Sequence, residues 1–403
     1  MLQPKKISRY FIILGGILLF AVAIITAQSI LLGPIRFLPG GQSYTHYNNY
    51  LIFKDSFFHL IEKKDLYQLF PSEEFDYYKY SPSFALAMFP LAYLPDGIGL
   101  FIWNFLNSFV LFLAIYKLPA QTEKRKLWMF LFVLIELITS LQNSQSNGLI
   151  AGLILLAFIL QERKRTALAT LCIVLTVFIK LFGLAALALF LLYPNKKKSV
   201  LYTAGWFVLI GLLPLLVIPF SQLSFLYKSW FQLLGNDHHA SYGLSFAGCV
   251  HSWFGVENKN AFVLVGVLIF CLPLLVKQKI FRSLQFRLYA VASLLIWIVI
   301  FNHKAESPTF IIAVTGISIW FFSQPLKTGN LILMILTLLF TILSPTSLFP
   351  ESIRDHFVIP YTLKVVPCIL VWFKITYDLI RLTPEEEIVE LKEEEYFPEN
   401  SLL

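Results

Sequence analysis

Acidic, aromatic and basic side chains are interleaved in the segment 73–82, which reads Glu-Glu-Phe-Asp-Tyr-Tyr-Lys-Tyr-Ser-Pro. A carboxylate can bind or deprotonate a hydroxyl group, and an aromatic face can stack on a sugar ring. Asp76 is therefore a candidate base, Tyr80 a candidate sugar-binding residue and Lys79 a candidate phosphate-binding residue. A solvated loop explains the acids, but it explains less well the four aromatic residues between 75 and 80.

The densest polar run between two apolar stretches is 302–310, which reads Asn-His-Lys-Ala-Glu-Ser-Pro-Thr-Phe. His303 could shuttle a proton near neutral pH. Glu306 could act as a base, and Lys304 could meet a phosphate. The alternative is an ordinary polar turn held by a capping box. We favour a functional role for this run, because two such apolar stretches need only two or three polar residues to form a turn.

Two Ser-Pro pairs, Ser81-Pro82 and Ser307-Pro308, each precede an apolar run. Serine is a good N-cap and proline a good first helical residue, so each pair predicts the start of a helix. The N–H groups of a helix N-terminus favour an anion, and Lys79 and Lys304 stand beside the two pairs. Phosphate binding is one interpretation of Ser81 and Ser307, and plain helix capping is the other.

The amide-rich run 142–148, Gln-Asn-Ser-Gln-Ser-Asn-Gly, joins two apolar stretches. Amides suit sugar hydroxyls because each offers both a donor and an acceptor. The candidate sugar-binding residues here are Asn143, Gln145 and Asn147. Spacings of four, three and four residues separate Glu136, Ser140, Asn143 and Asn147. On a helix, these spacings place the four side chains on one face. An acid inside a span, as Glu136 is, is often functional, although interhelical hydrogen bonding is the alternative.

Lys180 interrupts an apolar stretch at its predicted external end. It could snorkel toward the membrane surface, or it could be the counter-charge of a lipid phosphate. The run Asp237-His238-His239 is weak evidence for a metal, and no cysteine pair is spaced like a metal clip. We therefore expect no metal.

The composition predicts an all-α polytopic membrane protein, because 57% of the 403 residues are hydrophobic and only 14% are charged. The first apolar run, 10–32, follows Lys5, Lys6 and Arg9, which places the N-terminus in the cytoplasm. Together with this run, about twelve transmembrane helices are expected, the others at approximately 97–117, 127–141, 148–160, 166–180, 182–193, 200–219, 261–277, 287–302, 309–322, 329–343 and 361–380.

The loops differ in charge on the two predicted sides of the membrane. Basic residues concentrate on the cytoplasmic side, whereas the long loop 33–82 and the polar turns lie outside. The segment 84–94 is read as an interfacial or re-entrant helix. The domain 1–380 is followed by an acidic cytoplasmic tail, 381–403, that we expect to be disordered. Scattered basic loops point to membrane lipids as partners, and not to nucleic acid.

Several short motifs together resemble glycosyltransferase family 87, over about 45 to about 320. Each motif is short, but their order and spacing are fairly specific. They are Asp65-Leu66-Tyr67, Lys79-Tyr80-Ser81-Pro82, the run Pro-Leu-Ala-Tyr-Leu-Pro at 90–95, Trp103-Asn104, the pair Gln145 and Asn147, and the run Ile-Lys-Leu-Phe-Gly at 179–183.

The resemblance implies a GT-C-type bundle in the cytoplasmic membrane with its active site on the outer face. Such enzymes transfer a hexose, here mannose-like, from a polyprenyl-phosphate donor to a lipid or glycan acceptor. They use no nucleotide sugar, and the resemblance implies neither a metal nor another cofactor.

The family also implies an acid in the first external loop as the base, at a position that falls near Asn48-Asn49. An amide cannot accept the proton, so Asn49 is assigned to sugar binding. The base is then Asp76 or Glu306, with Asp55 next, or His303, unless the activity has been lost.

Two other functions remain open at this point. A transporter or flippase for a lipid-linked sugar would place charge at mid-membrane, where Glu136 is the one residue in its favour. A non-catalytic protein could keep the GT-C fold without the base. The polar groups lie mostly at the external ends of the apolar runs, which favours an enzyme.

Overall fold

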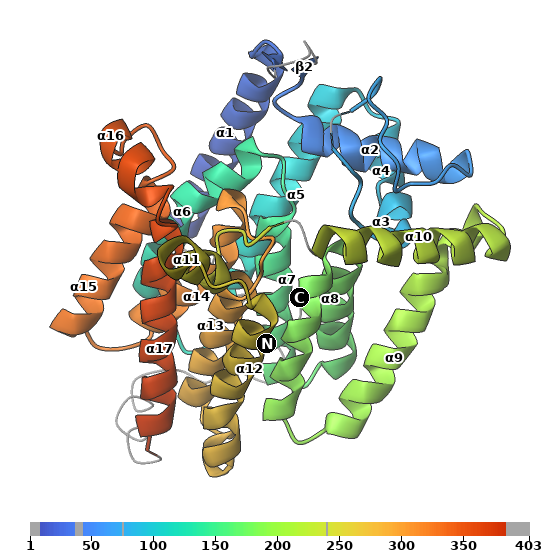
Figure 1. Ribbon diagram of the computed structural model, residues 1–403. Helices are drawn as coiled ribbons and strands as arrows, with labels where there is room; N and C mark the ends of the chain where they lie inside the picture. The colour runs from blue at the N-terminus through green and yellow to red at the C-terminus, as the bar shows by residue number, and fades with distance from the viewer. Residues whose placement is uncertain (1–8, 37–42, 75, 239–240, 384–403) are drawn as a thin grey trace.

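A computed structural model describes residues 9–36, 43–74, 76–238 and 241–383. The chain is mainly helical over these residues (Figure 1). The β structure is one antiparallel pair, β1 (Ile35–Arg36) with β2 (Ser43–Tyr44). The predicted all-α membrane class is confirmed at this level. Of the predicted acidic tail, 384–403 lies outside the described residues.

A bundle of closely packed helices forms the centre of the molecule. The pairs α13 with α14, α5 with α7 and α7 with α8 make its most extensive packing. The helices of the bundle are α1 (Arg9–Leu31), α5 (Asp96–Tyr116), α6 (Glu123–Gln142), α7 (Asn147–Glu162), α8 (Thr166–Ile179), η1 (Leu181–Leu192), α13 (Leu284–Ile300), η4 (Ser307–Thr309), α14 (Phe310–Phe322) and α17 (Val366–Arg381).

Further helices cover the sides of the bundle. They are α9 (Lys196–Leu212), η2 (Leu213–Leu216), α11 (Phe246–Phe254), α12 (Lys259–Val276), η3 (Gln278–Ile280), α15 (Thr328–Leu336), η5 (Thr337–Leu343), α16 (Glu351–Ile353), η6 (Arg354–Val358) and η7 (Leu363–Val365). Both α9 and α12 bury little surface and expose large side chains such as Leu201 and Leu275. In lipid such faces need no further cover.

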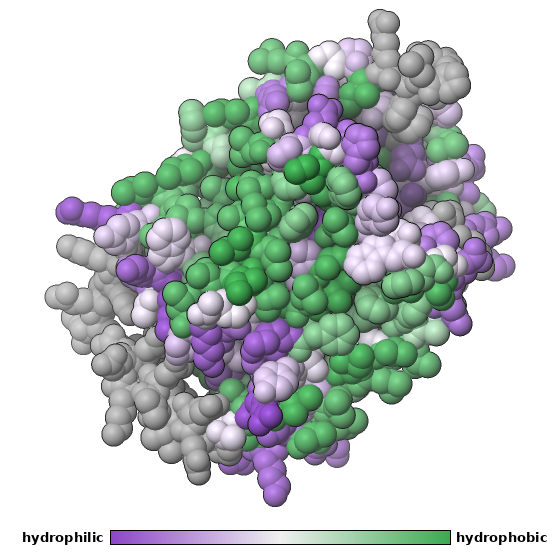
Figure 2. Space-filling view, turned by 60° about the vertical axis from the view of Figure 1, so that its left-hand side comes forward, coloured by the Kyte–Doolittle hydropathy of each residue, from purple (hydrophilic) through white to green (hydrophobic). Residues whose placement is uncertain are grey.

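A broad hydrophobic band crosses the face of the molecule seen in Figure 2, with hydrophilic residues gathered above and below it. This distribution is the one expected of a chain that sits in a bilayer.

The prediction of about twelve full crossings is wrong. Within the described residues, four helices are long and apolar enough to span a membrane, namely α1, α5, α12 and the continuous stretch of α9 and η2. A fifth span results if the two parts of a pair bent by 92°, Glu351–Val358 and Leu363–Arg381, count as one. Six further apolar helical segments have only 10–17 residues. A 16-residue α-helix is about 24 Å long, less than the hydrocarbon core of about 30 Å.

The expected long external loop contains a helix of its own. α2 (Asn48–Ile61) lies at one end of the bundle, beside α3 (Pro82–Ala87), α4 (Phe89–Ala92) and α10 (Phe220–His238) (Figure 1). Its Phe53 makes edge-to-face contacts with Tyr80, Phe84 and Trp103, at centroid distances of 4.8, 5.5 and 5.4 Å. α3 and α4 are too short to cross the membrane, which agrees with an interfacial or re-entrant segment.

Close packing of α5 against α7 requires a glycine at 152. A Cβ there would lie 2.7 Å from Leu111 N and 2.8 Å from Val110 C, which are backbone atoms that cannot rotate away. We expect Gly152→Ala to destabilise the protein by about 1–3 kcal/mol through overpacking. Gly205→Ala is the control, because nothing lies within 4 Å of its added Cβ. Thermal unfolding in detergent should show a lower Tm for Gly152→Ala alone, and equal melting of the two variants would contradict the packing argument.

Candidate active site

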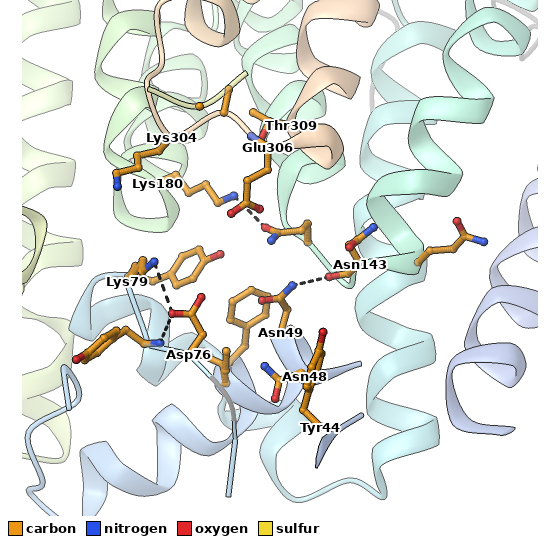
Figure 3. Close-up of a pocket in the computed structure, with 18 of the residues that line it drawn as sticks. Tyr44, Asn48, Asn49, Asp76, Lys79, Asn143, Lys180, Lys304, Glu306 and Thr309 are labelled. Atoms are coloured by element: carbon orange, nitrogen blue, oxygen red, sulfur yellow. Dashed lines mark hydrogen bonds and ion pairs between the residues drawn. The ribbon is translucent and has the colours of Figure 1, made fainter. Parts of the chain in front are cut away.

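A cavity of about 1020 Å³ opens at the end of the bundle where α1 ends and α2 begins (Figure 3). Segments far apart in the chain converge on it, including 44–53, 76–80, 142–145, 180–182 and 302–306. The lining contains the following residues named from the sequence: Asn49, Asp76, Lys79, Tyr80, Asn143, Gln145, Lys180, His303, Lys304 and Glu306. Asp55, Ser81, Asn147 and Ser307 are not among its lining residues.

Asp76 and Lys79 form one wall of the cavity. Asp76 has φ +95°, a conformation rare for a residue with a side chain and often found at functional sites. Its Oδ1 accepts a hydrogen bond from Tyr77 N–H at 2.7 Å and lies 3.7 Å from Lys79 Nζ. Figure 3 shows the Asp76 carboxylate pointing into the cavity. The turn thus holds an acid and a base side by side at the cavity surface.

Ser81 supports this wall from behind. Its Oγ accepts a hydrogen bond from Phe84 N–H at 3.1 Å, which caps α3 as the sequence predicts. The same hydroxyl donates to Phe178 O at 2.6 Å, and the residue is fully buried. Ser81 therefore ties the wall to the end of α8, and it does not face the cavity.

Lys180 occupies the break between α8 and η1, where the backbone is extended (φ −141°, ψ 125°). Its Nζ donates to Gln145 Oε1 and to Asn147 Oδ1, both at 3.0 Å. It also lies 5.9 Å from the centre of the Tyr80 ring, within range of a cation–π contact. Both oxygen acceptors are neutral, so they hold the ammonium group at the cavity without cancelling its charge. Asn147 thus holds Lys180 in place although it does not itself line the cavity.

The amide-rich turn differs from the prediction in one respect. α6 ends at Gln142 and α7 begins at Asn147, so the proposed single helix face that joined Glu136 to Asn147 does not exist. Ser144, with φ +51°, reverses the chain between the two helices. This reversal turns Asn143 and Gln145 toward the cavity.

The turn 302–306 forms the opposite wall. Glu306, and not Ser307, is the cap residue of η4, and its N–H donates to Thr309 Oγ1 at 3.2 Å. The predicted capping role of Ser307 is therefore wrong, because Ser307 is already inside the helix. Its Oγ accepts a hydrogen bond from Lys364 Nζ at 2.8 Å. Figure 3 shows the Glu306 carboxylate directed into the cavity near Lys180.

A second segment braces this turn. Leu244 N–H donates to Ala305 O at 2.8 Å, and Ser241 Oγ donates to His303 O at 3.0 Å. Gly243 has φ +56°, and a Cβ on it would lie 2.5 Å from His303 O. Only glycine permits this close approach. The segment 241–244 thus holds one side of the turn.

The two amides at the expected base position do reach the cavity. Asn48 and Asn49 form the first turn of α2, and Asn49 Nδ2 donates to Asn143 O at 2.9 Å. Both side chains line the cavity with the acids Asp76 and Glu306 (Figure 3).

Asp55 and Glu74 form a separate acidic pair beneath the cavity wall. Burial raises the pKa of Asp55 to about 6, and the pKa of Glu74 to about 8. The negative charge of Asp55 raises the pKa of Glu74 further, and Glu74 Oε2 has no hydrogen-bond partner in the described part of the chain. Asp55 lies in α2 away from the cavity surface, so the geometry does not favour it as a base.

The sequence analysis missed several cavity residues. Gln28 and Ser29 come from the end of α1, and Thr45, His46 and Ser241 come from connecting segments. Polar residues at the end of an otherwise apolar span were a signal for the first two. No local pattern distinguishes the other three from ordinary loop residues.

A cavity with three lysines, two carboxylates and several amides can bind an anion and a polyhydroxyl group side by side. Comparison with protein-family models matches residues 78–311 to glycosyltransferase family 87, which is more than half of the chain. The matched region includes Lys79, Lys180 and Glu306, whereas Asp76 and the two asparagines lie before it. No curated protein matches the chain.

The raised pKa of Glu74 predicts how stability depends on pH. Between its ordinary pKa of 4.5 and about 8, the folded chain holds a proton that the unfolded chain has released. The free energy of unfolding should therefore fall as pH rises through this window and level off above it. Glu74→Gln should flatten the fall in Tm, whereas Glu123→Gln at an exposed site should not. Parallel profiles for wild type and Glu74→Gln would contradict this expectation.

Proposed function

Because the chain belongs to glycosyltransferase family 87, we propose that this membrane glycosyltransferase transfers a mannose-like hexose from a polyprenyl-phosphate donor to a lipid or glycan acceptor. The observation that carries the proposal is the convergence of lysines, carboxylates and amides on one cavity at a single end of the bundle.

The phosphate of the donor is assigned to the lysines. Lys180 is held by neutral oxygens and has its charge available for an anion, and Lys304 and Lys79 line the same cavity. The departing phosphate gains negative charge in the transition state, so fixed cations stabilise it more than they stabilise the ground state.

Glu306 is our first choice for the base. Its carboxylate points into the cavity, and the residue is fixed by the capping contact with Thr309. Asp76 is the second choice, because it already faces Lys79 as an ion pair. In the proposed step the base takes the acceptor hydroxyl proton while the oxygen attacks the sugar C1. The bond from C1 to the phosphate oxygen breaks, and the polyprenyl phosphate leaves with the electron pair.

The hydroxyls of the sugar are assigned to the amides and to one aromatic ring. Asn49, Asn143 and Gln145 line the cavity together with the two acids, and Tyr80 offers a ring for stacking. His303 lies on the same wall as Glu306, where it could relay a proton.

The charge distribution supports an active site on the outer face of the cytoplasmic membrane. α6 and α7 meet at the cavity, so their other ends lie at the far end of the bundle (Figure 1). Those far ends carry the basic runs 124–126 and 163–165. Short loops rich in Lys and Arg stay in the cytoplasm, which supports a cavity on the opposite side of the membrane.

A transfer assay tests the function. Purified protein in liposomes is incubated with radiolabelled polyprenyl-phosphate mannose or glucose and a lipid extract, and the products are separated by chromatography. A new labelled glycoside supports the proposal. Movement of the donor across the liposome without a product indicates a transporter, and neither result indicates a non-catalytic protein.

Substitution of the carboxylates distinguishes the two candidate bases. If Glu306 is the base, Glu306→Gln should lower kcat by about 10²–10⁴-fold, the usual contribution of a general base. Asp76→Asn should then have the smaller effect. Asp55→Asn is the matched control, because Asp55 does not line the cavity and should leave kcat unchanged. Wild-type kcat for both Glu306→Gln and Asp76→Asn would exclude this assignment of the base.

Removal of the Lys180 charge should weaken donor binding. A hydrogen bond to a charged group contributes about 1.5–3 kcal/mol, so we expect Lys180→Met to raise the donor KM by about 10- to 100-fold. It should lower kcat as well, because the negative charge of the phosphate grows in the transition state. Lys228→Met is the control, because Lys228 is exposed on α10 outside the cavity. Steady-state kinetics at varied donor concentration measure both. An unchanged KM for Lys180→Met would place the phosphate elsewhere.

A further inference from the structure

A buried ion pair stands directly behind the turn that presents Glu306. Lys364 Nζ lies 2.8 Å from Glu136 Oε1 and donates to Ser307 Oγ at the same distance. Glu136 is completely buried, and the side chain of Lys364 is 5% exposed. One ammonium group thus joins α6, η7 and the residue that follows Glu306.

The chain makes an unusual turn to deliver this lysine. Lys364 stands at the start of the segment Leu363–Arg381, which is bent by 92° from the preceding segment Glu351–Val358. Between the two segments, Thr362 takes a left-handed conformation with φ +53°. Thr341 Oγ1 then donates to Lys364 O at 2.7 Å, which fixes the backbone. The Nζ atom lies 4.9 Å from the centre of the Phe310 ring, at the start of α14.

Stability alone is a poor explanation for this pair. Removing two charges from water is unfavourable, and buried pairs can often be replaced by neutral side chains without loss of stability. Among the residues that the structure describes, Glu136 Oε2 and the neighbouring Ser140 Oγ have no hydrogen-bond partner, so the acid is not fully compensated. A buried ion pair that contributes little to stability is suited to holding the chain in one conformation.

We infer that the pair of Lys364 and Glu136 is a positioning device for the turn 302–306, and that it sets the direction of the Glu306 carboxylate through Ser307. The inference rests on the proposed function, because it takes Glu306 as a group that meets the substrate. Lys364 and Glu136 themselves do not line the cavity. They act through the hydrogen bond to Ser307, which precedes Pro308 and follows Glu306.

The test replaces both charges at once. Glu136→Gln with Lys364→Met leaves no unpaired buried charge, so the double variant should fold. We expect its kcat to fall by about 10- to 100-fold, since small misplacements of a reacting group have effects of this size. The donor KM should change by less than about threefold, because the lysines of the cavity are intact. Hydrogen–deuterium exchange of the full-length protein in liposomes should rise in the peptide that covers 302–309.

A partly buried pair elsewhere in the bundle provides the control. Arg287 donates to both carboxylate oxygens of Glu162 at 2.7 Å. Glu162 ends α7, about 22 Å along the helix from Asn147. Glu162→Gln with Arg287→Met should leave kcat and the exchange of 302–309 at wild-type values. Equal loss of kcat in both double variants would contradict the inference, because it would indicate general destabilisation of the bundle.

The exchange measurement separates the two proposals. An inactive wild-type protein would overturn the proposed function, while the exchange of 302–309 would still report on the pair. Wild-type exchange in this peptide, together with wild-type kcat in the Glu136→Gln and Lys364→Met double variant, would overturn the inference.

Discussion

A charged side chain that is buried in this bundle needs hydrogen bonds from other protein groups in place of water. The hydrogen bonds of Lys180 illustrate this constraint. The lysine sits where α8 breaks, and two amide oxygens from the neighbouring turn solvate it in place of water. The turn must therefore stay folded back against α8. That requirement keeps the ends of α6, α7 and α8 together and leaves a cavity between them and α2.

The cavity is built from helix ends, and this explains why much of it was predictable. Between apolar stretches, a run such as 142–148 or 302–310 has few reasons to be polar other than its own turn and a ligand. Lys180 was identified in the same way, as a polar residue that interrupts an apolar stretch. Because loops at one side of a membrane lie at a common level, residues in separate turns could be expected to meet, and ten of those named do so.

The remaining features depend on contacts that no local pattern contains. The partner of Glu136 lies 228 positions along the chain, and nothing around Lys364 marks it as buried. Ser307 looked like a cap, but Glu306 with Thr309 takes that position. The number of spans was overestimated because several apolar runs, such as 148–160 and 182–193, form helices of only 10–17 residues, which are shorter than a full span.

The contact of Lys364 with Glu136 also crosses the boundary of the family match, which ends at residue 311. The conserved catalytic portion of a domain is often treated as a unit that can be exchanged between relatives. Here, a chimera joined after residue 311 would inherit the acid from one parent and would need a suitably placed cation from the other. The helices after residue 311 thus cannot be exchanged on their own. Substitutions in the two parts of the chain would have to be made together.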